Sequence, residues 1–146
     1  MFCGWVAMKQ DDLGRWYLRE QPTGTWVDEI HPWKELAQRE HIVSMGIDQC
    51  ATGLRDDFGD YIKKPTDITS NDEAILRPFA TFRCNGRHVH AQPCNKQLTQ
   101  AQHYTRRLQS AFVESVYLAK MLDKLRGDTP EKLAQAFPNQ MFPLGR

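Results

Sequence analysis

A long helical repeat of apolar and small residues near the C-terminus is the pattern that most constrains the fold. Thr99 and Gln102 have the spacing of a capping box, and Gly127 favours the end of a helix. Between them the residues that share one helix face are Ala101, Tyr104, Leu108, Ala111, Phe112, Ser115, Ala119, Leu122 and Leu125. The sequence therefore predicts a long helix over residues 99–127, which any fold of this chain must accommodate.

Upstream of that helix, shorter patterns predict three extended segments and three helices. The extended segments are residues 15–20, 42–47 and 61–69, and Pro65 favours an edge position or a bulge over a central position for the last of them. One short helix is predicted in residues 1–12, with Phe2, Trp5, Val6 and Met8 on one side. A second follows Thr25 as N-cap, with Pro32 as a kink or restart and with Trp26, Ile30, Trp33 and Ala37 on its apolar face. A third opens at a capping box, residues 70–73, with Ile75, Leu76, Phe79 and Phe82 inward.

This order of elements predicts an α/β fold. Strands separated by helices usually form a parallel sheet covered on its faces. Three strands make a small sheet, so we expect a partial Rossmann-like layer structure and, as a partner, another chain that completes the sheet. The 146 residues are enough for one core. We expect one α/β domain over residues 1–127, then a short helix and a weakly ordered tail over 128–146.

The charges are segregated along the chain although the formal net charge is only +1. Fourteen of the eighteen acidic residues lie at or before Glu73, and residues 74–113 contain none. Such segregation indicates an anionic partner. We predict DNA or RNA on a basic face, bound by Lys63, Lys64, Arg83, Arg87, Arg106 and Arg107.

A short loop punctuated by Gly86 and Pro93 carries several ligands suited to soft metals. They are Cys84, His88, His90 and Cys94. Cysteine and histidine hold zinc tetrahedrally when their donor atoms converge at about 2.0 to 2.3 Å from the ion. Cys50 follows a predicted strand and competes with Cys94 as the fourth ligand. The alternative is a basic turn with two packed cysteines and no metal.

Other features narrow the setting and the chemistry. The four cysteines are too few and too unevenly placed for a secreted disulfide scaffold, so we expect reduced thiols and an intracellular chain, in cytoplasm or nucleus. No stretch approaches the roughly 20 apolar residues of a membrane span. Glycine-rich phosphate loops and a nucleophile elbow are both missing. Cys–His catalysis through Cys50 or Cys84 has no third, orienting residue to support it.

An ordered series of short motifs resembles a known protein family. The series is Gly14-Arg15-x-x-Leu18-x-Glu20-Gln21-Pro22, Asp48-Gln49-Cys50-x-x-Gly53-Leu54, Gly59, Lys64-Pro65-Thr66 and Cys84-x-Gly86-x-His88-x-His90. Across residues 10–107 it resembles the later half of a domain similar to DNA-cytosine methyltransferases, found in retrotransposon-type polyproteins of protists and fungi.

The resemblance implies a truncated methyltransferase-like domain derived from a mobile element. Glu20 would contact the target base as the acidic catalytic residue. The cofactor loop and the Pro-Cys nucleophile would lie upstream of Met1, so the chain alone is expected to be inactive and not to bind S-adenosylmethionine. Cys94 stands where the family pattern has glycine. The competing hypothesis is a small zinc-stabilised module that binds nucleic acid or another protein.

Overall fold

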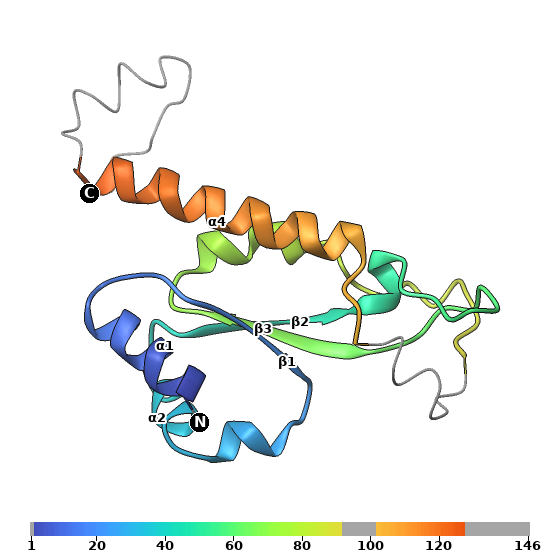
Figure 1. The fold of residues 1–146 in the computed structure, drawn as a ribbon, viewed down its shortest axis with the longest axis horizontal. Coiled ribbons are helices and arrows are strands. Elements are labelled where there is room, and N and C mark those ends of the chain that lie inside the picture. The colour runs from blue at the N-terminus through green and yellow to red at the C-terminus, as the bar shows by residue number, and fades with distance from the viewer. Residues whose placement is uncertain (1, 92–101, 128–146) are drawn as a thin grey trace.

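The computed structural model describes residues 2–91 and 102–127, which form a mixed α/β fold around a three-stranded sheet. In chain order the elements are α1 (Phe2–Asp12), β1 (Leu18–Pro22), the 3-10 turn η1 (Trp26–Glu29), α2 (Trp33–Leu36), β2 (Val43–Asp48), η2 (Gln49–Thr52), β3 (Pro65–Ser70), η3 (Glu73–Phe79) and α4 (Arg106–Gly127). Figure 1 shows the sheet edge on, with η3 and α4 on one side and α1, η1 and α2 on the other. The expected helices and extended segments are therefore present, with shifted boundaries.

The sheet is antiparallel, and the prediction of a parallel sheet was wrong. Its order is β1-β3-β2, and Ile68 of β3 stands opposite Glu20 on one side and Met45 on the other. The prediction assumed that helices carry the chain between neighbouring parallel strands. Here η1 and α2 are single turns between β1 and β2, and β3 separates those two strands.

The strand β3 lies at the centre of the sheet, so the edge position predicted from Pro65 was wrong as well. Pro65 is the first residue of β3, a position where a strand tolerates proline. The chain extends the pairing just before it, because Lys64 accepts a hydrogen bond from the Gln49 amide at 3.1 Å. Proline therefore marks where the central strand begins.

One face of the sheet packs on η3 and α4 to form the main core. Its buried members come from β2, β3, η3 with the residues just after it, and α4. They are Ile47, Ile68, Leu76, Phe79, Phe82, Leu108 and Ala111. The inward positions predicted for the third helix are confirmed, since Ile75, Leu76, Phe79 and Phe82 are all buried. The cap differs, because Asp72 rather than Ser70 accepts the Ala74 amide.

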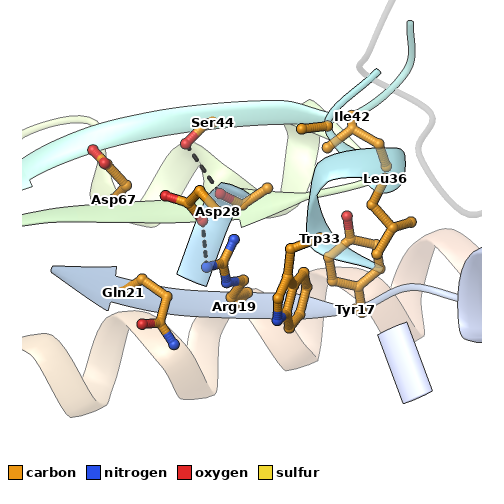
Figure 2. Close-up of a pocket in the computed structure, with 11 residues that line it drawn as sticks. Tyr17, Arg19, Gln21, Asp28, Trp33, Leu36, Ile42, Ser44 and Asp67 are labelled. Carbon is orange, nitrogen blue, oxygen red and sulfur yellow. Dashed lines mark hydrogen bonds and ion pairs between the residues drawn. The ribbon is translucent and has the colours of Figure 1, made fainter. Parts of the chain in front are cut away.

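The opposite face of the sheet is polar and borders a pocket of about 260 Å³ under η1 and α2 (Figure 2). Arg19 reaches across it from β1, donates to Asp28 at 2.5 Å and stacks on the Trp33 ring at 4.1 Å. Ser44 and Thr69 share a hydrogen bond of 3.0 Å between neighbouring strands. The two contacts of Arg19 attach η1 and α2 to the sheet.

The helix α1 is present as predicted, but it turns a different side inward. Gly4, Ala7 and Met8 are buried, whereas Phe2 and Trp5 are 80% and 51% exposed. A Cβ atom on Gly4 would stand 2.8 Å from the Pro32 ring, so the close approach of α1 to that ring requires glycine. Close packing at a glycine, rather than the largest apolar side chains, sets the rotation of the helix.

Parts of the sequence predictions lie outside the described residues: Cys94, the Thr99 cap and the helix and tail over 128–146. The long helix is confirmed from Arg106 to its predicted end at Gly127, but its predicted start was wrong, because residues 102–105 precede the helix and are not helical. Within the part of the chain that the structure describes, no helix combines the length and the apolar character needed to cross a bilayer.

Candidate metal centre

The first metal-ligand candidate, Cys50, is positioned by the turn that follows β2. The turn η2 begins at Gln49 and ends at Gly53, whose φ of 94° is left-handed and suits glycine. Thr52 donates its hydroxyl to the Gln49 carbonyl at 2.7 Å and accepts from Thr105 at 2.8 Å, which ties the turn to the start of α4. Cys50 is therefore buried, 1% exposed, at a well-supported point of the fold.

The second candidate, Cys84, is held against the end of β2. The Asp48 amide donates to the Phe82 carbonyl at 2.8 Å, and the Asp48 carboxylate accepts the Cys84 amide at 3.0 Å. Gly86 has a φ of 71°, and its amide donates to the Cys84 sulfur at 3.5 Å. This local turn orients the sulfur.

The two histidines are positioned by Tyr61. His90 forms an isolated parallel bridge with Tyr61, and the Ala91 amide donates to the Tyr61 carbonyl at 2.8 Å. The His88 ring lies on the Tyr61 ring with 4.0 Å between centroids, and the Arg55 guanidinium covers the tyrosine at 3.6 Å. In Figure 1 the two loops, residues 50–62 and 84–91, lie side by side at one end of the sheet.

The four side chains converge closely enough to share one ion. Their ligand atoms all lie within 4.8 Å of one another, so Cys50, Cys84, His88 and His90 could hold a metal ion. The Cys84 sulfur is 3.5 Å from His90 Nε2 and 3.7 Å from His88 Nε2. A sulfur and a nitrogen bound to one tetrahedral zinc ion stand about 3.6 Å apart, given bonds of about 2.3 and 2.0 Å. The measured distances fit that geometry.

The protonation of Cys50 is shaped by its surroundings. Burial first, and then the neighbouring Cys84 and Asp48, raise the pKa of the Cys50 thiol to about 11. A buried thiol of this kind stays protonated at neutral pH unless a cation replaces the proton. Three ligands of the centre, Cys84, His88 and His90, are half-buried. The fourth, Cys50, is buried, and its sulfur needs a positive charge beside it to ionise.

The structure brings together Cys50 with three of the four ligands predicted in the loop. Cys94, the competing fourth ligand, lies outside the described residues. The sequence signal for Cys50 was its place directly after a buried strand, and β2 does deliver it to the loop.

The predicted nucleic-acid contacts differ in how they are held. Lys63, Arg87 and Arg106 are exposed. Arg107 donates to the Ala51 carbonyl at 3.3 Å and lies over Phe82 with 5.4 Å to the ring centroid. These four cations lie on the loops that carry the metal ligands or at the adjoining start of α4.

Two further cations of that predicted set lie against the sheet. The Arg83 guanidinium lies against Gly46, because its Nη1 is 3.2 Å from the point where a Cβ atom on that glycine would stand, and Asp67 Oδ1 is 3.4 Å from the same point. Lys64 Nζ stands 3.7 Å from a Glu20 oxygen. Both side chains therefore have contacts within the fold.

Glu20, predicted from the resemblance as a base contact, lies in the middle of β1 and belongs to a polar cluster. One of its oxygens accepts the Tyr104 hydroxyl at 2.6 Å, and the other stands 3.3 Å from Gln49 Nε2 and 3.7 Å from Lys64 Nζ. Burial and the Glu20 carboxylate raise the pKa of Tyr104 well above its ordinary value.

Gln49 is the member of this cluster that sequence reasoning missed. It is fully buried, donates to Thr66 at 2.9 Å, and has a buried Oε1 atom without a partner among the described residues. Its only signals in the sequence were its place beside Cys50 and its membership of the resembling motif Asp48-Gln49-Cys50. The cluster thus connects the middle of β1 to the turn that carries a metal ligand.

Comparison with protein-family models, with curated proteins and with solved structures finds no match.

Proposed function

We propose that this chain is a small zinc-stabilised module that binds nucleic acid. The observation that carries the proposal is the convergence of Cys50 with Cys84, His88 and His90. Two thiolates and two neutral imidazoles are a common ligand set for structural zinc, and with Zn²⁺ they form a neutral centre. Zinc would fix the 84–90 loop on the end of β2, where the chain has few large buried side chains.

The nucleic-acid part of the proposal is supported by charge and position. Arg87 comes from the metal loop, Lys63 follows Tyr61, and Arg106 opens α4. A metal that fixes the loop would also fix the spacing of these cations, which suits repeated contacts with phosphates. No acidic residue interrupts residues 74–113.

The test measures zinc content and nucleic-acid affinity on the same preparation. Chain purified without added metal should contain about one zinc per molecule. Affinity for duplex DNA should fall with salt, with a logarithmic slope of about 0.9 for each phosphate contact. Arg87→Gln with Arg106→Gln should weaken binding and lower the slope, whereas the matched pair Lys9→Gln with Arg15→Gln should do neither. A slope near zero for the wild type would reject nucleic-acid binding.

A second candidate function is the truncated methyltransferase-like domain of a mobile element. The observation that favours it is the position of Glu20 among Gln49, Lys64 and Tyr104, where three of the resembling motifs meet. The Rossmann-like layering that this candidate implies gains no support from the antiparallel sheet. Calorimetry with S-adenosylmethionine should show no binding to this chain alone, and a micromolar dissociation constant would reject the view that the cofactor site lies elsewhere.

A further inference from the structure

The two sulfur ligands of the candidate metal centre are close enough to react with each other. The sulfur atoms of Cys50 and Cys84 lie within 4.8 Å, and both thiols are free. A disulfide bond is about 2.05 Å long. The sulfurs therefore need to approach by less than about 3 Å, which is within the reach of side-chain rotation and a small loop shift.

A small oxidant can approach Cys50 through a cleft and Cys84 from the solvent. Cys50 and His88 line an open cleft of about 280 Å³, together with Thr81, Asn85 and Arg107, and its lining contains no carboxylate. Cys84 is half-buried, at the border of the solvent. Hydrogen peroxide is only slightly larger than water, so it fits such a cleft, and thiolates that are accessible are the ones it oxidises first.

We propose that Cys50 and Cys84 are a peroxide-sensitive thiol pair whose disulfide expels the metal. This inference rests on the zinc centre of the proposed function. The Cys84 sulfur attacks one oxygen of hydrogen peroxide, the O–O bond breaks, and the departing hydroxide takes a proton to become water. The sulfur now carries a sulfenic acid.

The second step closes the disulfide. The Cys50 sulfur attacks the Cys84 sulfur, the S–O bond breaks, and a second hydroxide leaves and is protonated to water. The two sulfurs have lost two electrons and peroxide has gained them, while Zn²⁺ keeps its oxidation state. Only His88 and His90 then remain as ligands, and two neutral imidazoles hold zinc far less tightly than the full set.

The disulfide would join the same two segments that the metal joins. It would connect η2 with the 84–90 loop, while His88 keeps its stacking on Tyr61. The oxidised chain should therefore remain folded after it has lost its metal. Oxidation would replace the metal by a Cys50–Cys84 disulfide as the link between these segments. The imidazoles of His88 and His90 would then carry no metal.

The experiment treats the zinc-loaded full chain with hydrogen peroxide. Zinc release is followed with a coloured chelator, and after free thiols have been alkylated the crosslinked peptides are identified by mass spectrometry. We expect release of the bound zinc in step with a Cys50–Cys84 crosslink, and its recovery after dithiothreitol and added zinc. Cys3→Ser and Cys94→Ser should leave both results unchanged.

Several outcomes would overturn the inference. One is a crosslink that joins Cys84 to Cys94, and another is oxidation of Cys84 to sulfonic acid with no crosslink. Because Cys50→Ser can lose zinc for a simpler reason, the decisive comparison is wild-type chain stripped of metal, which should form the same crosslink. A chain that never binds added zinc but forms the Cys50–Cys84 crosslink refutes the proposed metal centre, and with it the expulsion of the metal. Zinc that stays bound in peroxide refutes the inference and leaves the metal centre standing.

Discussion

Replacing Gln49 with methionine tests whether the polar cluster of Glu20, Gln49, Lys64 and Tyr104 supports the metal centre. Methionine is unbranched and apolar and adapts to irregular space, so Gln49→Met removes the amide with little change in volume. The variant loses the hydrogen bonds to Thr66 at 2.9 Å and to the Glu20 carboxylate at 3.3 Å. A neutral bond contributes about 1 kcal/mol and a charged one about 1.5 to 3 kcal/mol.

The loss is partly offset because Gln49 Oε1 is buried without a partner among the described residues. Removing an unsatisfied acceptor recovers about 1 to 3 kcal/mol. The expected net loss in the free energy of unfolding is therefore about 1.5 kcal/mol. Urea titration of the zinc-loaded chain measures it. The zinc affinity should also fall by about tenfold, because Gln49 fixes the turn that presents Cys50.

The matched control is Gln38→Met in the exposed turn after α2, which should change stability by less than about 0.5 kcal/mol. Competition with a chelator of known affinity gives the zinc dissociation constant of both variants. If Gln49→Met binds zinc and unfolds like the wild type, the cluster does not position Cys50 and this part of the account is wrong.

Two further changes test the packing. Gly4→Ala should destabilise the chain by about 1 to 3 kcal/mol in thermal or urea unfolding, since the new Cβ would lie 2.8 Å from Pro32 and 3.0 Å from Trp33; the exposed neighbour Cys3→Ala is the control, and equal stability of both variants would contradict the close contact. Burial and the Asp11 carboxylate raise the pKa of Tyr17 from 10.0 to about 12. The stability from this neutral hydroxyl is present below pH 10 and is lost as pH rises toward 12, so Tyr17→Phe should flatten that decline, and an unchanged pH profile would contradict it.

The sequence predicted the elements better than it predicted their arrangement. Local signals were reliable where one residue decides the matter, as with the Thr25 cap, the restart after Pro32 and the end of α4 at Gly127. No local pattern in the sequence predicts the direction of a strand. It depends on which strands pair, and β3 comes last in the chain yet lies between β1 and β2.

The side of α1 that faces the core could not be predicted either, for a related reason. Phe2 and Trp5 are the largest apolar residues of α1, but the contact of Gly4 with Pro32 determines which side faces inward. No periodic pattern reveals a glycine that is needed for close approach.

The candidate metal centre was partly visible in the sequence because three ligands lie close together in one loop. The fourth, Cys50, was one of two open choices, since spacing along the chain does not reveal which strand end meets a loop. Gln49 and Tyr104 carried no chemical pattern of their own, and their meeting with Glu20 depends on the fold.

X-ray absorption at the zinc edge of the zinc-loaded chain is the most direct test of the proposed metal ligands, because it reports the atoms bound to the metal. The account predicts two sulfur ligands at about 2.3 Å and two imidazole nitrogens at about 2.0 Å. This spectrum should persist in Cys94→Ser and lose one sulfur in Cys50→Ser. A shell without sulfur, or a sulfur that disappears in Cys94→Ser and persists in Cys50→Ser, would contradict the assignment of Cys50, Cys84, His88 and His90 as the metal ligands.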